Sequence, residues 1–136
     1  MRVAAALTAA VLVLSNCQSD VLASAKGGRS RPGDDSALST MERIAVSAQK
    51  CWFSGKDSAF KGLRLSPELS SHSGKPRILA VPGKNIGGLP KLVIEATGNP
   101  ARLSAFGPLM DGEHAARIEK DVLRWAGRDA VCASAG

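Results

Sequence analysis

Two cysteines that lie far apart in this 136-residue chain place the strongest constraint on its fold. Cys51 and Cys132 enclose most of the segments that the hydrophobic pattern assigns to strands and helices. In an oxidising compartment such a pair tends to be joined, and a bridge closing a loop of about 80 residues stabilises a fold by roughly 4–5 kcal/mol. A redox-active pair would need a C-x-x-C motif, which is lacking. We therefore predict a structural disulfide, if the chain reaches such a compartment.

The first residues indicate that it does. Arg2 is the only charge among the first nineteen residues, and an apolar run at 3–14 is broken only by Thr8. A run of that length is shorter than the roughly 20 residues that cross a bilayer. A basic start followed by a short apolar stretch is typical of a secretory signal peptide. We predict a signal peptide over 1–16 and an exported protein.

Two cleavage sites compete after this run. The stretch LSNC at 14–17 resembles the bacterial lipobox, with Leu14, Ser15 and Cys17 in place and Asn16 where the motif prefers a smaller residue. An A-x-A site ending at Ala25 is the alternative. That site lies far beyond the apolar run, so we favour the lipobox. Either cut removes Cys17 from the disulfide pool and resolves the odd cysteine count.

The lipobox resemblance implies that Cys17 is acylated and anchors the chain in a membrane. Gln18 follows it, where Asp is the residue that retains lipoproteins in the inner membrane, so we favour the outer membrane with the domain facing the periplasm. Residues 17–39 are rich in Ser, Gly and Asp and predict a flexible tether with a reach of about 25 Å. Cleavage at Ala25 would instead give a soluble periplasmic or secreted protein.

Residues 40–136 are predicted to form one small domain that begins with a helix over 40–52. Ser39 and Glu42 have the spacing of a capping box. Apolar side chains then recur with the period of one helical face. They are Met41, Ile44, Ala45, Ala48 and Trp52.

A second helix is expected from Asp111, as N-cap, to Gly127. One face carries apolar residues, and the other is expected to be polar, with a pair between Glu113 and Arg117. The apolar face comprises Ala115, Ile118, Val122, Trp125 and Ala126, and the polar face Arg117, Lys120, Asp121, Arg124 and Arg128.

Between the helices, period-two alternation and turn residues predict strands. The segments are 62–66, 76–82, 91–97 and 101–106, the last two joined by a hairpin turn at 97–100. The predicted fold is α+β: a small antiparallel sheet of three to four strands, with two flanking helices on one face, closed by one disulfide. Because Cys51 ends the first helix and Cys132 follows the second, we expect the C-terminal ends of both helices to meet.

This order of elements is similar to that of the C-terminal domains of the TolA and TonB envelope proteins. The similarity covers residues 41–127 and rests on element order and the position of Trp52. It implies a partner-binding fold and transfers no functional residue.

No catalytic or metal-binding motif is found. His72 lies in a turn of Ser, Gly and Lys, and His114 lies in the expected first turn of the second helix, so both are interpreted as surface residues. No nucleophile elbow or zinc-binding helix is present. We predict a non-enzymatic protein without a cofactor.

The sheet region is basic: residues 56–102 carry eight Lys or Arg against three Asp or Glu. With both helices on one face, Arg64, Lys91 and Arg102 are candidates for an anion-binding open face. Export and the scarcity of aromatic residues argue against nucleic acid. The leading hypothesis is a cell-envelope lipoprotein that acts as a tethered protein-interaction module. The alternative is a periplasmic domain that binds an anionic envelope polymer.

Overall fold

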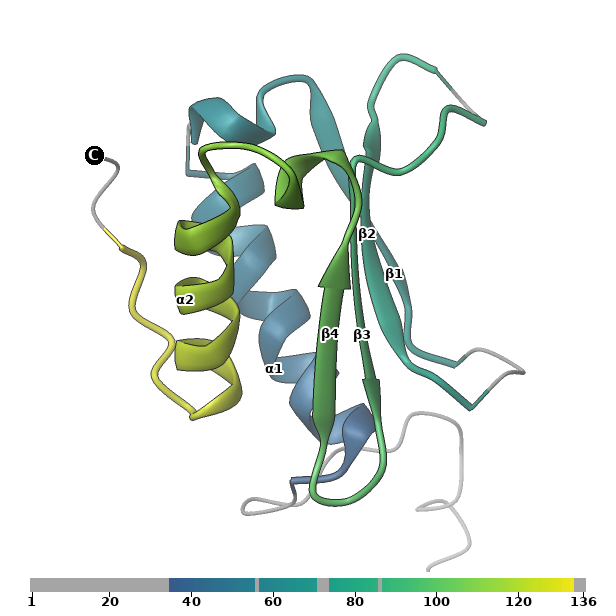
Figure 1. Ribbon diagram of the computed structural model, residues 1–136, viewed down its shortest axis with the longest axis vertical. Coiled ribbons are helices and arrows are strands. Elements are labelled where there is room, and N and C mark those ends of the chain that lie inside the picture. Colours follow the sequence, from purple (N-terminus) through teal and green to yellow (C-terminus); the bar gives the residue numbers. More distant parts are fainter. Residues whose placement is uncertain (1–34, 56, 71–73, 86, 134–136) are drawn as a thin grey trace, which may run out of the picture.

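The computed structural model describes residues 35–55, 57–70, 74–85 and 87–133. Within them, four strands form one antiparallel sheet in the order β1-β2-β3-β4, and two helices lie together on one face of that sheet (Figure 1). The predicted α+β fold is confirmed, with four strands. The predicted signal peptide and all but the end of the predicted tether lie outside the described residues.

Helix α1 spans Ala37–Ala48 and continues into a π-helical turn, η2, at Gln49–Phe53. The predicted capping box at Ser39 is wrong, because Ser36 is the N-cap and its Oγ accepts from the Ser39 amide at 3.4 Å. Ser39 is instead 1% exposed inside the helix. The earlier start has a tertiary cause: the Ala37 amide donates to the carbonyl of Gly98, in the turn between β3 and β4, at 2.9 Å.

The apolar stripe predicted on α1 is confirmed and forms the centre of the core. Met41, Ile44 and Ala48 are fully buried, and Trp52 is 2% exposed. Trp52 stacks on Phe60 from the 3-10 turn η3 (Ser58–Phe60), with ring centroids 4.5 Å apart. Burial of this stripe against the sheet is the main source of stability for α1, since short helices are marginal alone.

The strands fall close to their predicted bounds. They are β1 (Leu63–Glu68), β2 (Arg77–Pro82), β3 (Leu92–Thr97) and β4 (Arg102–Phe106). Pro67 lies in β1, which is an edge strand, as its missing amide requires. Alternate side chains of the central strands, Ile78, Ile94 and Ala96 among them, point into the core beneath the helices.

Helix α2 spans Ala115–Ala126 and is shorter than predicted. Asp111 is not its N-cap, because the chain after β4 first forms a 3-10 turn, η4, at Pro108–Met110. The Leu109 amide donates to the carbonyl of Lys91 at 2.9 Å, which holds that turn against the start of β3. Gly127 ends the helix, as predicted.

The two helices run in opposite directions, so the prediction that their C-terminal ends meet is wrong. Arg43, in α1, donates to the carbonyl of Ala126, the last residue of α2, at 3.1 Å, and Arg128 pairs with Asp35 at 2.6 Å. The end of α2 therefore lies beside the first half of α1. A four-strand meander that starts directly after α1 has this consequence, because each strand reverses the chain direction.

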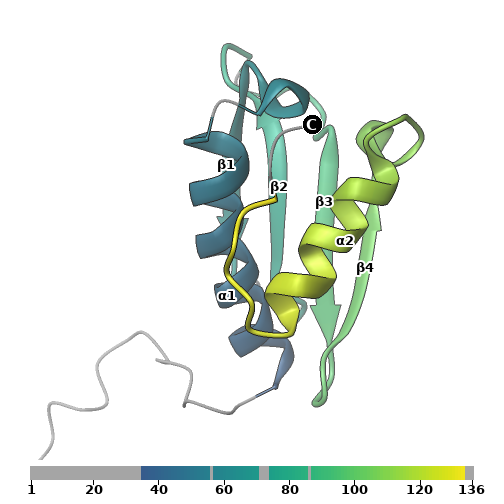
Figure 2. The same cartoon turned by 90° about the vertical axis from the view of Figure 1, so that its left-hand side faces the viewer.

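The segment after α2 makes the disulfide possible although the two helices are antiparallel. It turns back and runs along α1 (Figure 2), and Cys132 joins Cys51 with the two Cα atoms 5.3 Å apart. Six extended residues span about 20 Å, enough for this return. The predicted disulfide is confirmed, and it fastens a returning C-terminal segment rather than two helix ends.

We expect replacement of both bridging cysteines, Cys51→Ser with Cys132→Ser, to lower the free energy of unfolding by about 4–5 kcal/mol, because the loop is then open in the unfolded chain. Urea denaturation followed by tryptophan fluorescence measures this. Cys17→Ser is the control and should leave stability unchanged. Alkylation of Cys51 in the native protein without reductant would contradict the bridge.

Candidate functional site

The face of the sheet turned away from the helices is not covered by any described helix (Figure 1). We call it the outer face. Because side chains alternate along a strand, it carries every second residue of each strand. Its residues are Arg64, Ser66, Glu68, Arg77, Leu79, Val81, Val93, Glu95, Thr97, Arg102, Ser104 and Phe106.

An apolar row crosses this face. Leu79 lies opposite Val93, and Val93 lies opposite Phe106, so the three side chains are neighbours on adjacent strands. Val93 is only 9% exposed although no helix among the described residues covers it, and Phe106 is 48% exposed. Cross-strand contacts of this kind stabilise the sheet, but the row also leaves an aromatic ring available to a partner.

A polar row lies next to it. Glu68, Arg77 and Glu95 are in register on β1, β2 and β3. Arg77 Nη2 lies 2.6 Å from a carboxylate oxygen of Glu68, and the Ser104 hydroxyl donates to Glu95 at 3.4 Å. This row carries two carboxylates and one arginine, so it is slightly acidic.

The three residues predicted to bind an anion do not lie together. Arg64, in β1, lies opposite Val81 near the end of β2. Lys91 lies on the other side of β2 at the same end, where its amide donates to the carbonyl of Ala80 at 2.8 Å. Arg102 is opposite Thr97, at the other end of β3. Six residues of strand separate Lys91 from Thr97, a distance of about 20 Å. The geometry keeps two of the three residues at one end of the sheet.

The remaining predicted residues can be placed only in part. Cys17 and His72 lie outside the described residues. His114 precedes α2 and lies 3.6 Å from Glu113, which is 87% exposed. In the described part of the chain, no group of three His, Cys, Asp or Glu side chains is arranged to hold a metal ion.

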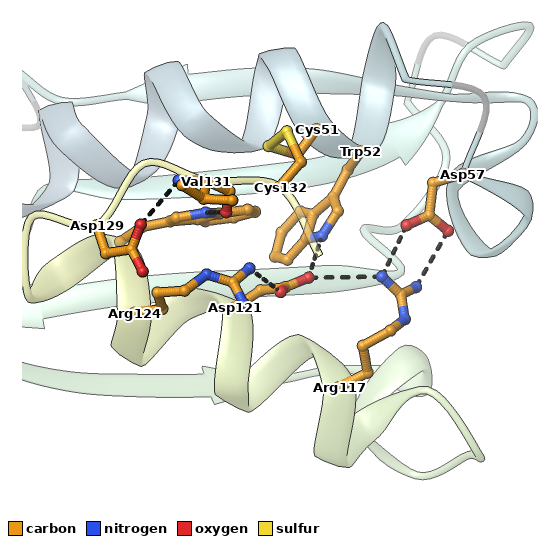
Figure 3. Close-up of a disulfide and its surroundings, with 10 residues drawn as sticks. Cys51, Trp52, Asp57, Arg117, Asp121, Arg124, Asp129, Val131 and Cys132 are labelled. Carbon is orange, nitrogen blue, oxygen red and sulfur yellow. Dashed lines mark hydrogen bonds and ion pairs between the residues drawn. A yellow bond between two sulfur atoms is a disulfide. The ribbon is translucent and has the colours of Figure 1, made fainter. Parts of the chain in front are cut away.

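A buried carboxylate beside the disulfide is the feature that sequence reasoning missed. Asp121 was assigned to the polar face of the second helix, but it is 2% exposed. Its Oδ2 accepts from Trp52 Nε1 at 2.9 Å and lies 3.5 Å from Arg117 Nη1, while Oδ1 accepts from Arg124 (Figure 3). Both oxygens are therefore occupied by donors of the same domain.

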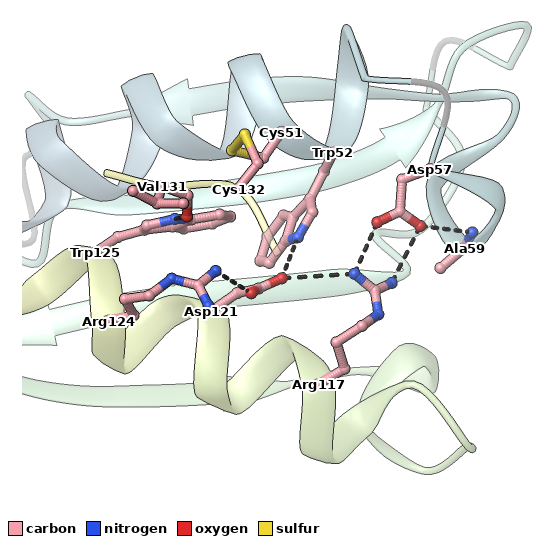
Figure 4. Close-up of polar contacts among 10 residues, drawn as sticks. All are labelled: Cys51, Trp52, Asp57, Ala59, Arg117, Asp121, Arg124, Trp125, Val131 and Cys132. Atoms are coloured by element: carbon pink, nitrogen blue, oxygen red, sulfur yellow. Dashed lines mark hydrogen bonds and ion pairs between the residues drawn. A yellow bond between two sulfur atoms is a disulfide. The ribbon is translucent and has the colours of Figure 1, made fainter. Parts of the chain in front are cut away.

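Arg117 extends this network to the start of η3. Its two terminal nitrogens donate to Asp57 at 2.7 and 3.0 Å, and an Asp57 oxygen also accepts from the Ala59 amide at 3.0 Å (Figure 4). The predicted pair with Glu113 is replaced by this two-pronged contact, which is the stronger geometry for arginine.

The arrangement joins α2 to η2 and η3, and its chemistry is structural. A carboxylate whose two oxygens already accept from Trp52, Arg117 and Arg124 has little capacity left to take a proton from a substrate. The sequence signal that could have found it is the spacing of Arg117, Asp121 and Arg124, which gathers three charges on one side of a helix next to its apolar stripe.

We expect Asp121→Asn to lower the free energy of unfolding by about 3 kcal/mol, because it removes the buried carboxylate that pairs with Arg124 and lies 3.5 Å from Arg117. Glu119→Gln makes the same change at an exposed position of α2 and should stay within about 0.5 kcal/mol of the parent. Urea denaturation of both variants provides the measurement. Equal losses would show that net charge, and not the buried network, is responsible.

The described residues contain no helix that is long and apolar enough to cross a membrane. Comparisons of the chain with protein-family models, with curated proteins and with solved structures find no significant match.

Proposed function

We propose that this chain is a non-enzymatic lipoprotein of the cell envelope, exported and anchored through Cys17, whose domain binds another envelope protein through the outer face. The observation that carries the proposal is the apolar row of Leu79, Val93 and Phe106 on a sheet face that neither described helix covers. Sheets with one solvated face normally alternate apolar-in and polar-out. A row that breaks this rule at an exposed aromatic ring marks a contact surface.

The surroundings of the row suit a protein partner. Protein interfaces combine an apolar centre, rich in aromatic residues, with a polar rim. Phe106 and its neighbours supply the centre, and the polar row through Glu68, Arg77 and Glu95 borders it. An apolar centre of three residues fits a small, transient interface rather than an obligate one.

An anionic polymer is the second candidate for the outer face. Arg64 and Lys91 support it, since both lie at the same end of the sheet. A polymer that also reached Arg102 would have to pass the row that holds Glu68 and Glu95. Two carboxylates on that path favour the protein partner.

Export and anchoring are supported by two features. The Cys51–Cys132 bridge is typical of oxidising compartments. The N-terminal pattern of a basic residue, an apolar run and an LSNC motif supplies the export signal and the acylation site.

We expect the mature protein, isolated from the membrane fraction of a bacterial host, to begin at Cys17 and to carry the mass of a diacylglyceryl group. Intact-mass spectrometry measures this directly. Cys17→Ser should release the protein from that fraction. A chain that begins at Lys26 and is recovered soluble would contradict the anchor while leaving the binding role of the domain open.

We expect a photo-crosslinking side chain placed at Ser104, next to Phe106 on the outer face, to capture an envelope protein in cells. Phe106→Lys should abolish the adduct, because it places a charge in the apolar row. Leu123→Lys changes an exposed leucine of α2, which is 57% exposed, and serves as the matched control. An adduct that survives Phe106→Lys would exclude the apolar row as the contact.

A further inference from the structure

Four basic side chains gather at the end of the sheet where β1 begins, β2 ends and β3 begins. The Gly83 amide donates to the Gly62 carbonyl at 2.9 Å, so the residues just outside that bond, Lys61 and Lys84, lie across from each other. Closer to the centre of the sheet, Arg64 and Lys91 lie on either side of the last residues of β2. We call Lys61, Arg64, Lys84 and Lys91 the basic end.

The charge of the basic end is not neutralised by the described residues. All four side chains are exposed, and none forms an ion pair with any residue that the structure describes. The segments 58–67 and 83–91, which supply them, contain no Asp or Glu. The nearest carboxylate before them in the chain, Asp57, is held by both terminal nitrogens of Arg117 at 2.7 and 3.0 Å. An anionic partner is therefore the complement of this surface.

An exposed leucine lies within the same end. Leu89 is 83% exposed, the highest value among the exposed large apolar residues of the described chain. It belongs to the loop between β2 and β3, which projects from the end of the sheet on the side away from the helices (Figure 1). Lys84 and Lys91 flank it in the sequence. A bare leucine between cations is the pattern of a surface that enters the boundary between headgroups and acyl chains.

We propose that the basic end docks on the surface of an anionic lipid bilayer, with Leu89 inserted at the headgroup level. The leucine decides between the possible anionic partners, because a polysaccharide or polyphosphate chain would satisfy the cations but offers no hydrocarbon to the Leu89 side chain. This contact goes beyond the proposed function. It requires neither acylation of Cys17 nor a protein bound to the outer face.

The position of the basic end is compatible with both other contacts. Residue 35, where the described chain begins, lies at the start of α1, at the opposite end of the domain from the 83–91 loop (Figure 1). The apolar row is the neighbouring row of the outer face, because Val93 follows Lys91 by two residues and Phe106 is the last residue of β4. A bilayer that contacts the basic end alone therefore leaves the start of α1 and the rows of the outer face beyond Arg64 and Lys91 uncovered.

Co-sedimentation with lipid vesicles tests the proposal. The protein is the mature chain from residue 17 onward carrying Cys17→Ser, so that neither an acyl chain nor the apolar run of the predicted signal peptide contributes and the N-terminal residues are the same in every variant. We expect binding to phosphatidylcholine vesicles that contain about one third phosphatidylglycerol, and at least tenfold weaker binding to phosphatidylcholine alone. Each basic residue near an anionic membrane is worth about a fivefold change in affinity. Lys84→Gln with Lys91→Gln should therefore weaken binding about 25-fold.

The matched control removes two charges elsewhere. Arg102→Gln with Lys120→Gln alters the other end of the sheet and an exposed position of α2, and should change binding less than threefold. Equal losses in both double variants would overturn the proposal, because net charge alone would then explain the binding.

The role of the leucine separates a bilayer from a soluble polyanion. Leu89→Ser should weaken vesicle binding several-fold and leave retention on a heparin column unchanged, whereas Leu123→Ser should change neither. Vesicle binding that is insensitive to Leu89→Ser, or equal binding to neutral and anionic vesicles, would overturn the lipid assignment. Circular dichroism of each variant confirms that the domain is folded.

Discussion

Burial of both helices against one face of the sheet is the constraint on which the rest of this structure depends. The apolar stripe of α1, centred on Ile44 and Trp52, and that of α2, centred on Ile118 and Trp125, share a single core with β2 and β3. A domain of this size has enough apolar surface for one such core. Neither of the two described helices covers the second face of the sheet, and its composition is then free to serve contact with other molecules.

The one-sided core also explains why the disulfide and the buried carboxylate lie together. Because α2 runs opposite to α1, its C-terminal end is remote from Cys51, and the following segment must return along α1. Trp125 Nε1 donates to the Val131 carbonyl of that segment at 3.3 Å, while Trp52 donates to Asp121 below it. The two indoles, whose centroids are 4.7 Å apart, thus have polar partners in different elements. The disulfide, the returning C-terminal segment and the Asp121 network all stabilise the contact between α2 and the α1–η2 helix.

Most of the fold could be predicted from the sequence, because strand alternation and helical periodicity are properties of short segments. The core stripe of α1, the strand segments and Gly127 as a helix end all follow from such patterns, whereas the Cys51–Cys132 bridge follows from the cysteine count and the expected compartment. The failures occur where a distant segment decides the outcome. A hairpin carbonyl moves the start of α1 from Ser39 to Ser36, and the packing of η4 against Lys91 delays α2.

The candidate sites show the same division. The outer face was predictable in outline, since alternation identifies which residues point away from the helices. The separation of Arg102 from Arg64 and Lys91 could also be predicted from the sequence. Lys91 directly precedes β3 and Arg102 begins β4, and consecutive antiparallel strands begin at opposite ends of a sheet. For Asp121, the spacing with Arg117 and Arg124 indicates a charged cluster, but its burial depends on Trp52, which lies 69 residues away in the sequence.

The distribution of charge gives the two proposed surfaces different physical characters. On the outer face, Arg77 is paired with Glu68, so long-range attraction is weak there and affinity must come from the fit of a partner around Phe106. At the basic end, Lys61, Arg64, Lys84 and Lys91 act at a distance of about a Debye length and need no matching shape. A fluid anionic bilayer offers negative charge but no fixed surface shape. A folded protein partner offers a complementary surface shape and needs little net charge. Each proposed partner would therefore meet a surface suited to it, and the two surfaces are adjacent and share Arg64.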